Sequence, residues 1–201
     1  FPTRRSSDLS DEIVPLTVKV GHKEVLFDQD EYPRETSLEK LSSLRPAFKK
    51  DGTVTAGNAS GINDGCAILV LMSQEKAVEL GIPVLAYIEA SASSGLDPNF
   101  MGLGPIEASK KALAKIQKTT ADIDLFEVNE AFAAQSIPVL TELGINPEKA
   151  NVNGGAIALG HPIGASGARI LVTLIHELGK RNGHLGLCSL CIGGGQGISM
   201  I

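Results

Sequence analysis

Two side chains in glycine-rich surroundings are the strongest candidates for acid–base chemistry in this sequence. Cys191 precedes the glycine run 193–195 by one residue, and the backbone N–H groups of such a run can lower the pKa of a thiol and bind an oxyanion. His161 stands between Gly160 and Pro162, so we expect a stiff loop that presents a general base or an oxyanion donor. On residue type alone, a buried structural cysteine and a surface histidine remain open alternatives.

Asn129 and Glu130 form a polar pair between an expected strand over 123–128 and an expected helix over 131–143. Ligands of α/β folds bind at the carboxyl ends of strands, so this position favours a ligand contact. Asn is also a preferred helix N-cap, and a purely structural role for Asn129 is the alternative.

Other kinds of site find less support in the sequence. Cys188 and Cys191 form a single Cys-x-x-Cys pair, whereas a structural zinc site needs four ligands. His161 and His184 do not complete the spacing of a zinc module, so we expect no metal, and a redox pair is the remaining alternative. The glycines over 57–65 and 160–167 match neither the dinucleotide fingerprint nor the end of a P-loop.

The elements that must position these residues alternate between helix and strand, which predicts an α/β fold with a layered sheet. Five glycines within 151–169 imply backbone that comes close to something, because glycine is costly in regular elements. We expect helices over 73–80, 105–119, 131–143 and 168–179, a helical turn or two over 38–44, and strands over 13–20, 66–72, 83–92, 123–128, 185–191 and 197–201.

Composition excludes several classes of protein. The 201 residues are 43% hydrophobic and carry a net charge of −5, which suits one or two globular domains and gives no reason to expect a nucleic-acid partner. No apolar run approaches the roughly 20 residues that span a membrane, so no membrane partner is expected. Three cysteines are an odd count, which favours a reducing, cytoplasmic location over a disulfide framework.

Four segments together resemble the thiolase family. Asn129–Ala133 is similar to its N-E-A-F motif, and residues 153–169 to its histidine loop G-G-x-x-x-x-G-H-P-x-G-x-S-G. Cys191–Gly197 is similar to its C-x-G-G-G-x-G terminus, and Gly57–Gly65 to its G-N-A-S-G-x-N-D-G turn. The match runs from about residue 10 to 201. The resemblance implies the C-terminal βαβαβαββ half of an α-β-α-β-α sandwich, with a mixed sheet and helices on both faces.

The resemblance also implies a role for each matching side chain. Cys191 would take the α-proton of a second acetyl-CoA, His161 would activate a nucleophilic cysteine and donate to one oxyanion hole, and Asn129 would hold a water in another. These roles are physically consistent, since the enolate must be stabilised where its charge develops. The residues expected to bind substrate or coenzyme A are Ser60 at the pantetheine arm, Met101 and Phe132 at the acyl group, Phe48 and Arg34 in the CoA-binding loop, and Gly193.

The glycine run after Cys191 favours acetyl-CoA acetyltransferases, which condense two acetyl-CoA reversibly into acetoacetyl-CoA and CoA. No separate cofactor is implied, because the coenzyme A thioester is the substrate. The family also implies lipid metabolism and a homo-oligomer, a tetramer or a dimer. A 3-ketoacyl-CoA thiolase of fatty-acid breakdown and a non-catalytic acyl-CoA-binding domain are the alternatives. The joint presence of Asn129, His161 and Cys191 favours an enzyme over a binding domain.

The family places its nucleophilic cysteine in an N-terminal half, which should precede Ser10 and which we expect to be missing. Cys66 begins an apolar run and does not replace it. We therefore expect an inactive piece of a thiolase that exposes the apolar face meant for the missing half. The predicted division is a non-native leader over 1–9, the end of the CoA-binding loop domain over 10–57, the last strand and helix of the N-terminal half over 58–80, and the C-terminal thiolase domain over 81–201.

Overall fold

The computed structural model describes residue 9 and residues 11–201, so the predicted leader over 1–9 lies almost entirely outside the described residues. The centre of the molecule is a four-stranded sheet in the order β3–β6–β5–β4. β3 (Ser91–Gly95) pairs antiparallel with β6 (Gln196–Met200), and β6 pairs antiparallel with β5 (Gly186–Ile192). β5 pairs parallel with β4 (Leu125–Val128), so the sheet is mixed.

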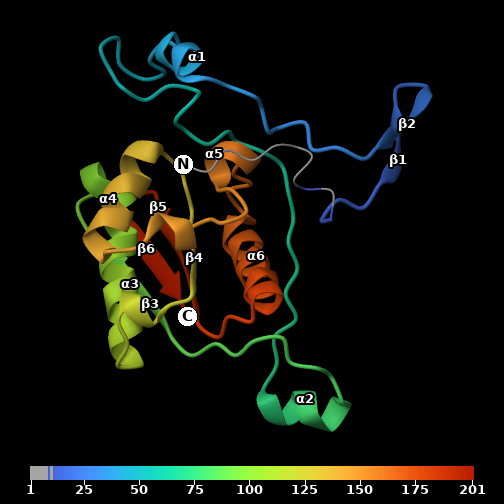
Figure 1. Cartoon of the computed structure of the whole chain (residues 1–201), viewed down its shortest axis with the longest axis vertical. Helices are drawn as coiled ribbons and strands as arrows, with labels where there is room; N and C mark the ends of the chain where they lie inside the picture. The colour runs from blue at the N-terminus through green and yellow to red at the C-terminus, as the bar shows by residue number, and fades with distance from the viewer. Residues whose placement is uncertain (1–8, 10) are drawn as a thin grey trace.

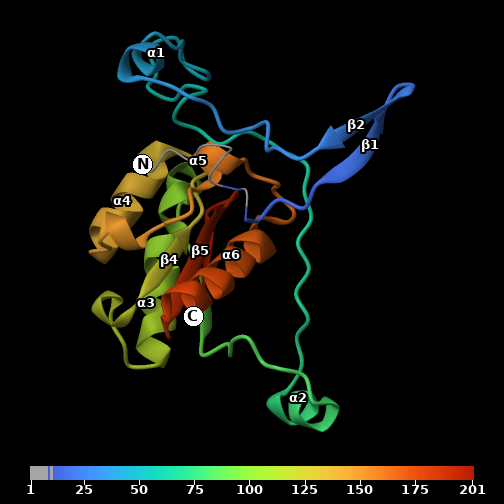
Figure 2. The ribbon, with the colours of Figure 1, turned by 45° about the vertical axis from the view of Figure 1, so that its right-hand side comes forward.

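Helices cover both faces of this sheet (Figures 1 and 2). α3 (Gly104–Lys115) and α4 (Ala133–Leu143) lie on one face, where Phe126, Val139 and Leu187 belong to the larger apolar cluster. α6 (Ser166–Arg181) lies on the other face, in a second cluster with Leu125 and Cys188. Parallel strands need a crossover connection, which α6 completes between β4 and β5. The predicted α/β fold with a mixed sheet and helices on both faces is confirmed.

Local signals set the ends of several helices as predicted. α2 (Gln74–Leu80) begins after Ser73, whose side chain accepts a hydrogen bond from the backbone of Lys76, and ends at Gly81 in the left-handed conformation. Gly144 ends α4 in the same way, with φ of 62°. The longest helix, α6, has 16 residues, and no helix in the described ranges is long and apolar enough to cross a bilayer.

The remaining elements lie around this body. β1 (Leu16–Val20) and β2 (Lys23–Phe27) form an antiparallel hairpin that projects outward (Figure 2). The short helices are α1 (Leu38–Ser42) and α5 (Ala156–Leu159), with 3-10 turns η2 (Pro98–Leu103), η3 (Thr120–Asp122) and η4 (Pro147–Lys149).

Two strand predictions are wrong. Residues 66–72 belong to no strand of the described chain, and Ile68 is 83% exposed. Only the last two residues of the strand predicted over 83–92 fall in β3, and Leu85 is 74% exposed. Both runs lie in the extended segments on either side of α2, away from the sheet (Figure 1). A strand needs a neighbour to pair its N–H and C=O groups. In the described chain only the end of the second run has one, where Glu89 and Ala90 donate to Ile201 O just before β3 begins.

Candidate active site

His161 lies in the loop between α5 and α6, and the loop is held by a segment from far away in the sequence. The His161 N–H donates to Gly61 O at 3.0 Å and to Asn63 Oδ1 at 3.2 Å. Gly160 has φ of 95°, and a Cβ at this position would overlap the side chain of Asn63. The segment over 61–63 therefore fixes the backbone of His161 from one side.

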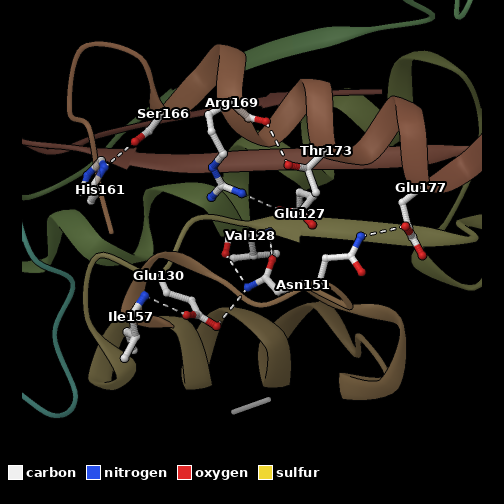
Figure 3. Close-up of polar contacts among 11 residues, drawn as sticks. Glu127, Val128, Glu130, Asn151, Ile157, His161, Ser166, Arg169, Thr173 and Glu177 are labelled. Atoms are coloured by element: carbon white, nitrogen blue, oxygen red, sulfur yellow. Dashed lines mark hydrogen bonds and ion pairs between the residues drawn. The ribbon is translucent and has the colours of Figure 1, made fainter. Parts of the chain in front are cut away.

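The surroundings of the His161 ring favour one neutral tautomer. Nδ1 lies 2.5 Å from Ser166 Oγ (Figure 3), and Ser166 Oγ lies 3.0 Å from Pro162 O, an acceptor for its only proton. With the Ser166 proton directed at Pro162 O, Ser166 Oγ accepts from Nδ1–H, and the neutral ring has its lone pair on Nε2. Burial, and secondarily the nearby Arg169 cation, lower the pKa of His161 and favour this neutral form. The ring can accept a proton at Nε2.

The side-chain amide of Asn129 lies beside Nε2 of His161. Its Nδ2 lies 3.5 Å from His161 Nε2, its side chain is buried, and its Oδ1 has no hydrogen-bond partner in the described part of the chain. The backbone N–H of Asn129 donates to Ser189 O at 2.9 Å, which extends the β4–β5 pairing. The N-cap of α4 is Phe132, so the alternative that Asn129 caps this helix is wrong.

Glu130 holds the other end of the histidine loop, a role that the sequence did not suggest. One carboxylate oxygen accepts from Asn151 Nδ2 and the other from the backbone N–H of Ile157, each at 3.1 Å (Figure 3). Gly155 packs on the carboxylate so closely that a Cβ there would overlap it. Burial raises the pKa of Glu130 above its ordinary value. The Gly154–Gly155 pair was the only signal in the sequence for this contact.

Three predicted substrate residues lie around the loop that follows Asn129. Ser60 donates both its N–H and its hydroxyl to Ala131 O, at 3.0 and 3.1 Å. The rings of Phe48 and Phe132 meet edge to face with centroids 6.1 Å apart. The structure therefore brings Ser60, Phe48 and Phe132 to the loop that carries Asn129.

Cys191 lies near the end of β5, opposite Gly197 of β6, and its thiol is free and partly buried. Among the described residues, its sulfur forms no hydrogen bond to another side chain. Burial raises the pKa of Cys191. Cys188 packs against α6, and residues three apart on a strand point to opposite faces, so the two thiols cannot hold one metal ion. Residues 9 and 11–201 contain no cluster of His, Cys, Asp and Glu suited to a metal.

The last three predicted residues take no part in the hydrogen bonds and the ring contact described above. Gly193 opens the turn between β5 and β6, and the space where its Cβ would be is empty. Met101 is half-buried in η2. Arg34 is exposed in the connection between β2 and α1, and it forms no ion pair with another described residue.

Relatives of this chain are acetyltransferases and thiolases. An acetyl-CoA acetyltransferase of Syntrophomonas wolfei is 58% identical over 198 residues, which cover 98% of this chain and 50% of that protein. The acetyl-CoA acetyltransferase of Escherichia coli is 59% identical over 191 residues, 94% of this chain and 48% of that protein. The chain spans about half the length of the curated relatives it matches.

Solved structures agree with the fold. The Bacillus anthracis acetyl-CoA acetyltransferase superposes with a TM-score of 0.90 at 54% identity, over 97% of this chain and 50% of that chain. The human mitochondrial 3-ketoacyl-CoA thiolase superposes with a TM-score of 0.86 at 44% identity, over 96% of this chain and 49% of that chain. The family description "Thiolase, C-terminal domain" matches residues 82–201, and "Thiolase, N-terminal domain" matches residues 3–75. The chain belongs to the thiolase family.

Proposed function

We propose that this chain carries the acid–base half of a thiolase active site, in a protein that condenses two acetyl-CoA into acetoacetyl-CoA and CoA. The observation that carries the proposal is the contact between His161 and Asn129, in which the ring nitrogen Nε2 and the amide nitrogen Nδ2 lie 3.5 Å apart. Claisen condensation of thioesters needs a base of this kind and donors aimed at the developing oxyanion. The 58% identity to an acetyl-CoA acetyltransferase supports the same substrate.

The first half-reaction forms an acetyl-enzyme. A cysteine thiol of the N-terminal half gives its proton to His161 Nε2, and its thiolate attacks the carbonyl carbon of acetyl-CoA. The C–S bond to CoA breaks, and the leaving thiolate takes the proton of Cys191. The acetyl group is then a thioester on the enzyme, and Cys191 is a thiolate. Because burial raises the pKa of Cys191, this thiolate is a stronger base.

The second half-reaction makes the carbon–carbon bond. The Cys191 thiolate removes an α-proton from a second acetyl-CoA, and the amide of Asn129 stabilises the enolate oxygen, directly or through a water. The enolate carbon attacks the acetyl-enzyme carbon, and the C–S bond to the enzyme breaks to release acetoacetyl-CoA. The enzyme thiolate recovers its proton from His161, which returns every group to its starting state.

A fused protein tests this function. The N-terminal half of the Escherichia coli acetyl-CoA acetyltransferase would be joined to residues 10–201, and thiolysis of acetoacetyl-CoA would be followed by its absorbance. We expect turnover, and a loss of about 10²–10⁴-fold for Cys191→Ala and for His161→Ala. Cys66→Ala is the matched control and should keep the full rate, because Cys66 is exposed. A folded fusion that binds CoA without turnover would establish the non-catalytic alternative instead.

A 3-ketoacyl-CoA thiolase is the second candidate, since the human mitochondrial enzyme of that name shares the fold at a TM-score of 0.86. The edge-to-face contact of Phe48 and Phe132 favours a short acyl group, because two rings in contact leave little room between them. The ratio of kcat/KM for acetoacetyl-CoA to that for a long-chain 3-ketoacyl-CoA decides between the two. A ratio below one in the fused protein would assign the degradative substrate.

A further inference from the structure

A buried ion pair lies one helical turn from the residue that holds His161. Arg169 Nη1 of α6 lies 3.5 Å from Glu127 Oε2 of β4, with side chains 21% and 2% exposed (Figure 3). Burying two charges carries a desolvation penalty that their attraction often fails to repay. General stability is therefore a weak reason for this pair, and its place in the fold suggests a more specific one.

The pair and the active-site contact join the same two elements. On α6, Ser166 and Arg169 are three residues apart and lie on one side of the helix. On the β4 side, Glu127 and Asn129 are two residues apart, so they point to one side of the sheet. Ser166 holds Nδ1 of His161 at 2.5 Å, and Asn129 Nδ2 stands 3.5 Å from Nε2. The two cross-links therefore run side by side between α6 and β4.

The first turn of α6 sets how far His161 stands from Asn129, because Ser166 is the side chain that holds the ring. Three residues correspond to about 4.5 Å along a helix, so Arg169 acts within one turn of that anchor. Arg169 also lines a hollow of about 380 Å³ together with Gly160 and Pro162, the two neighbours of His161. We propose that Arg169, held by Glu127, is a positioning residue that fixes His161 relative to Asn129 by tying α6 to β4.

The positive charge of Arg169 also keeps the His161 ring neutral, because it lowers the pKa of the imidazole. The charged group that acts on the His161 ring is Arg169, and the carboxylates that act on Arg169 in turn are Glu127, Glu130 and Glu12. Loss of Arg169 removes the cation that lowers the pKa of His161, so the imidazole becomes easier to protonate. A protonated ring has no lone pair on Nε2. The use of that lone pair as a base rests on the proposed function, whereas the position and protonation of the ring do not.

Nitrogen NMR of the histidine rings in the 201-residue chain tests the proposal without turnover. In the unchanged protein we expect a neutral His161 at pH 7 with its proton on Nδ1. Arg169→Met should shift the titration of His161 to higher pH and weaken the Nδ1–H signal, and Arg169→Lys should restore part of both. Arg181→Met is the matched control, because Arg181 pairs with Glu177 at 2.5 Å on the same helix, far from His161. It should leave the His161 spectrum unchanged.

The double variant Glu127→Gln/Arg169→Met separates position from folding, since it removes both charges of the ion pair together. We expect it to fold and to lose the Nδ1–H signal, and in the fused protein to lower kcat about 100-fold with KM within about threefold. A folded double variant with the His161 spectrum of the unchanged protein would overturn the proposal. If the unchanged fusion lacks turnover while the spectra change as expected, the proposed function fails and the positioning role stands.

Discussion

Gly155→Ala tests whether the glycines of the histidine loop serve the protein's own packing. The backbone of Gly155 has φ of −103°, which alanine adopts without strain, so the cost arises only from contact with Glu130. The new Cβ would overlap the carboxylate and force it away from Asn151 Nδ2 and the Ile157 N–H. Each lost hydrogen bond costs about 1–2 kcal/mol, so the free energy of unfolding should fall by about 2–4 kcal/mol.

Gly167→Ala is the matched control in the same segment. Gly167 lies in the first turn of α6 with nothing near the position of its Cβ. Alanine there should stabilise the protein by about 0.5–1 kcal/mol, because glycine is a poor helix former. Urea unfolding followed by circular dichroism gives both values. Glu130→Ala should add little to the loss when combined with Gly155→Ala, because both changes break the same two hydrogen bonds. The reasoning is refuted if Gly155→Ala is as stable as Gly167→Ala, or if the losses from Gly155→Ala and Glu130→Ala add fully in the double variant.

Three further outcomes follow from burial. Because burial lowers the pKa of His161 below its ordinary 6.5, the unfolded state takes up the proton first as the pH falls, and stability is lost below about pH 6.5. His161→Gln should remove that part of the slope in urea unfolding at pH 5.5 and 7.5, and an unchanged slope would contradict this. Iodoacetamide should label exposed Cys66 before Cys191 and leave Cys188 of the native protein unlabelled, because burial raises the pKa of Cys188 to about 12. Peptide mass spectrometry measures the order of labelling, and early labelling of Cys188 would count against the fold. Ile68→Ser should change the free energy of unfolding by less than about 0.5 kcal/mol, because that side chain is exposed, and it should reduce the light scattering caused by aggregation. A large destabilisation would show that residues 66–72 are buried in solution.

The sequence by itself determined most of the sheet and helices over 104–201. Periodicity and end signals are local, so Ser73, Gly81 and Gly144 mark helix ends whatever lies around them. The sequence also identified Asn129, His161 and Cys191 as candidates, because residue types and glycine spacing are visible without coordinates. The structure places the first two of these in contact and gives no hydrogen bond to the third within the described residues.

Only the tertiary structure decided what depends on a distant partner. Residues 66–72 have the composition of a strand, but pairing needs a neighbouring strand, and composition does not show whether one is present. The glycine run around Gly155 predicted a close approach without naming Glu130 as its cause. The favoured tautomer of His161 depends on Ser166 Oγ lying close to both Nδ1 and Pro162 O, an arrangement that only folding produces. Backbone preferences act over a few residues, whereas pairing, burial and proton positions depend on groups that only folding brings together.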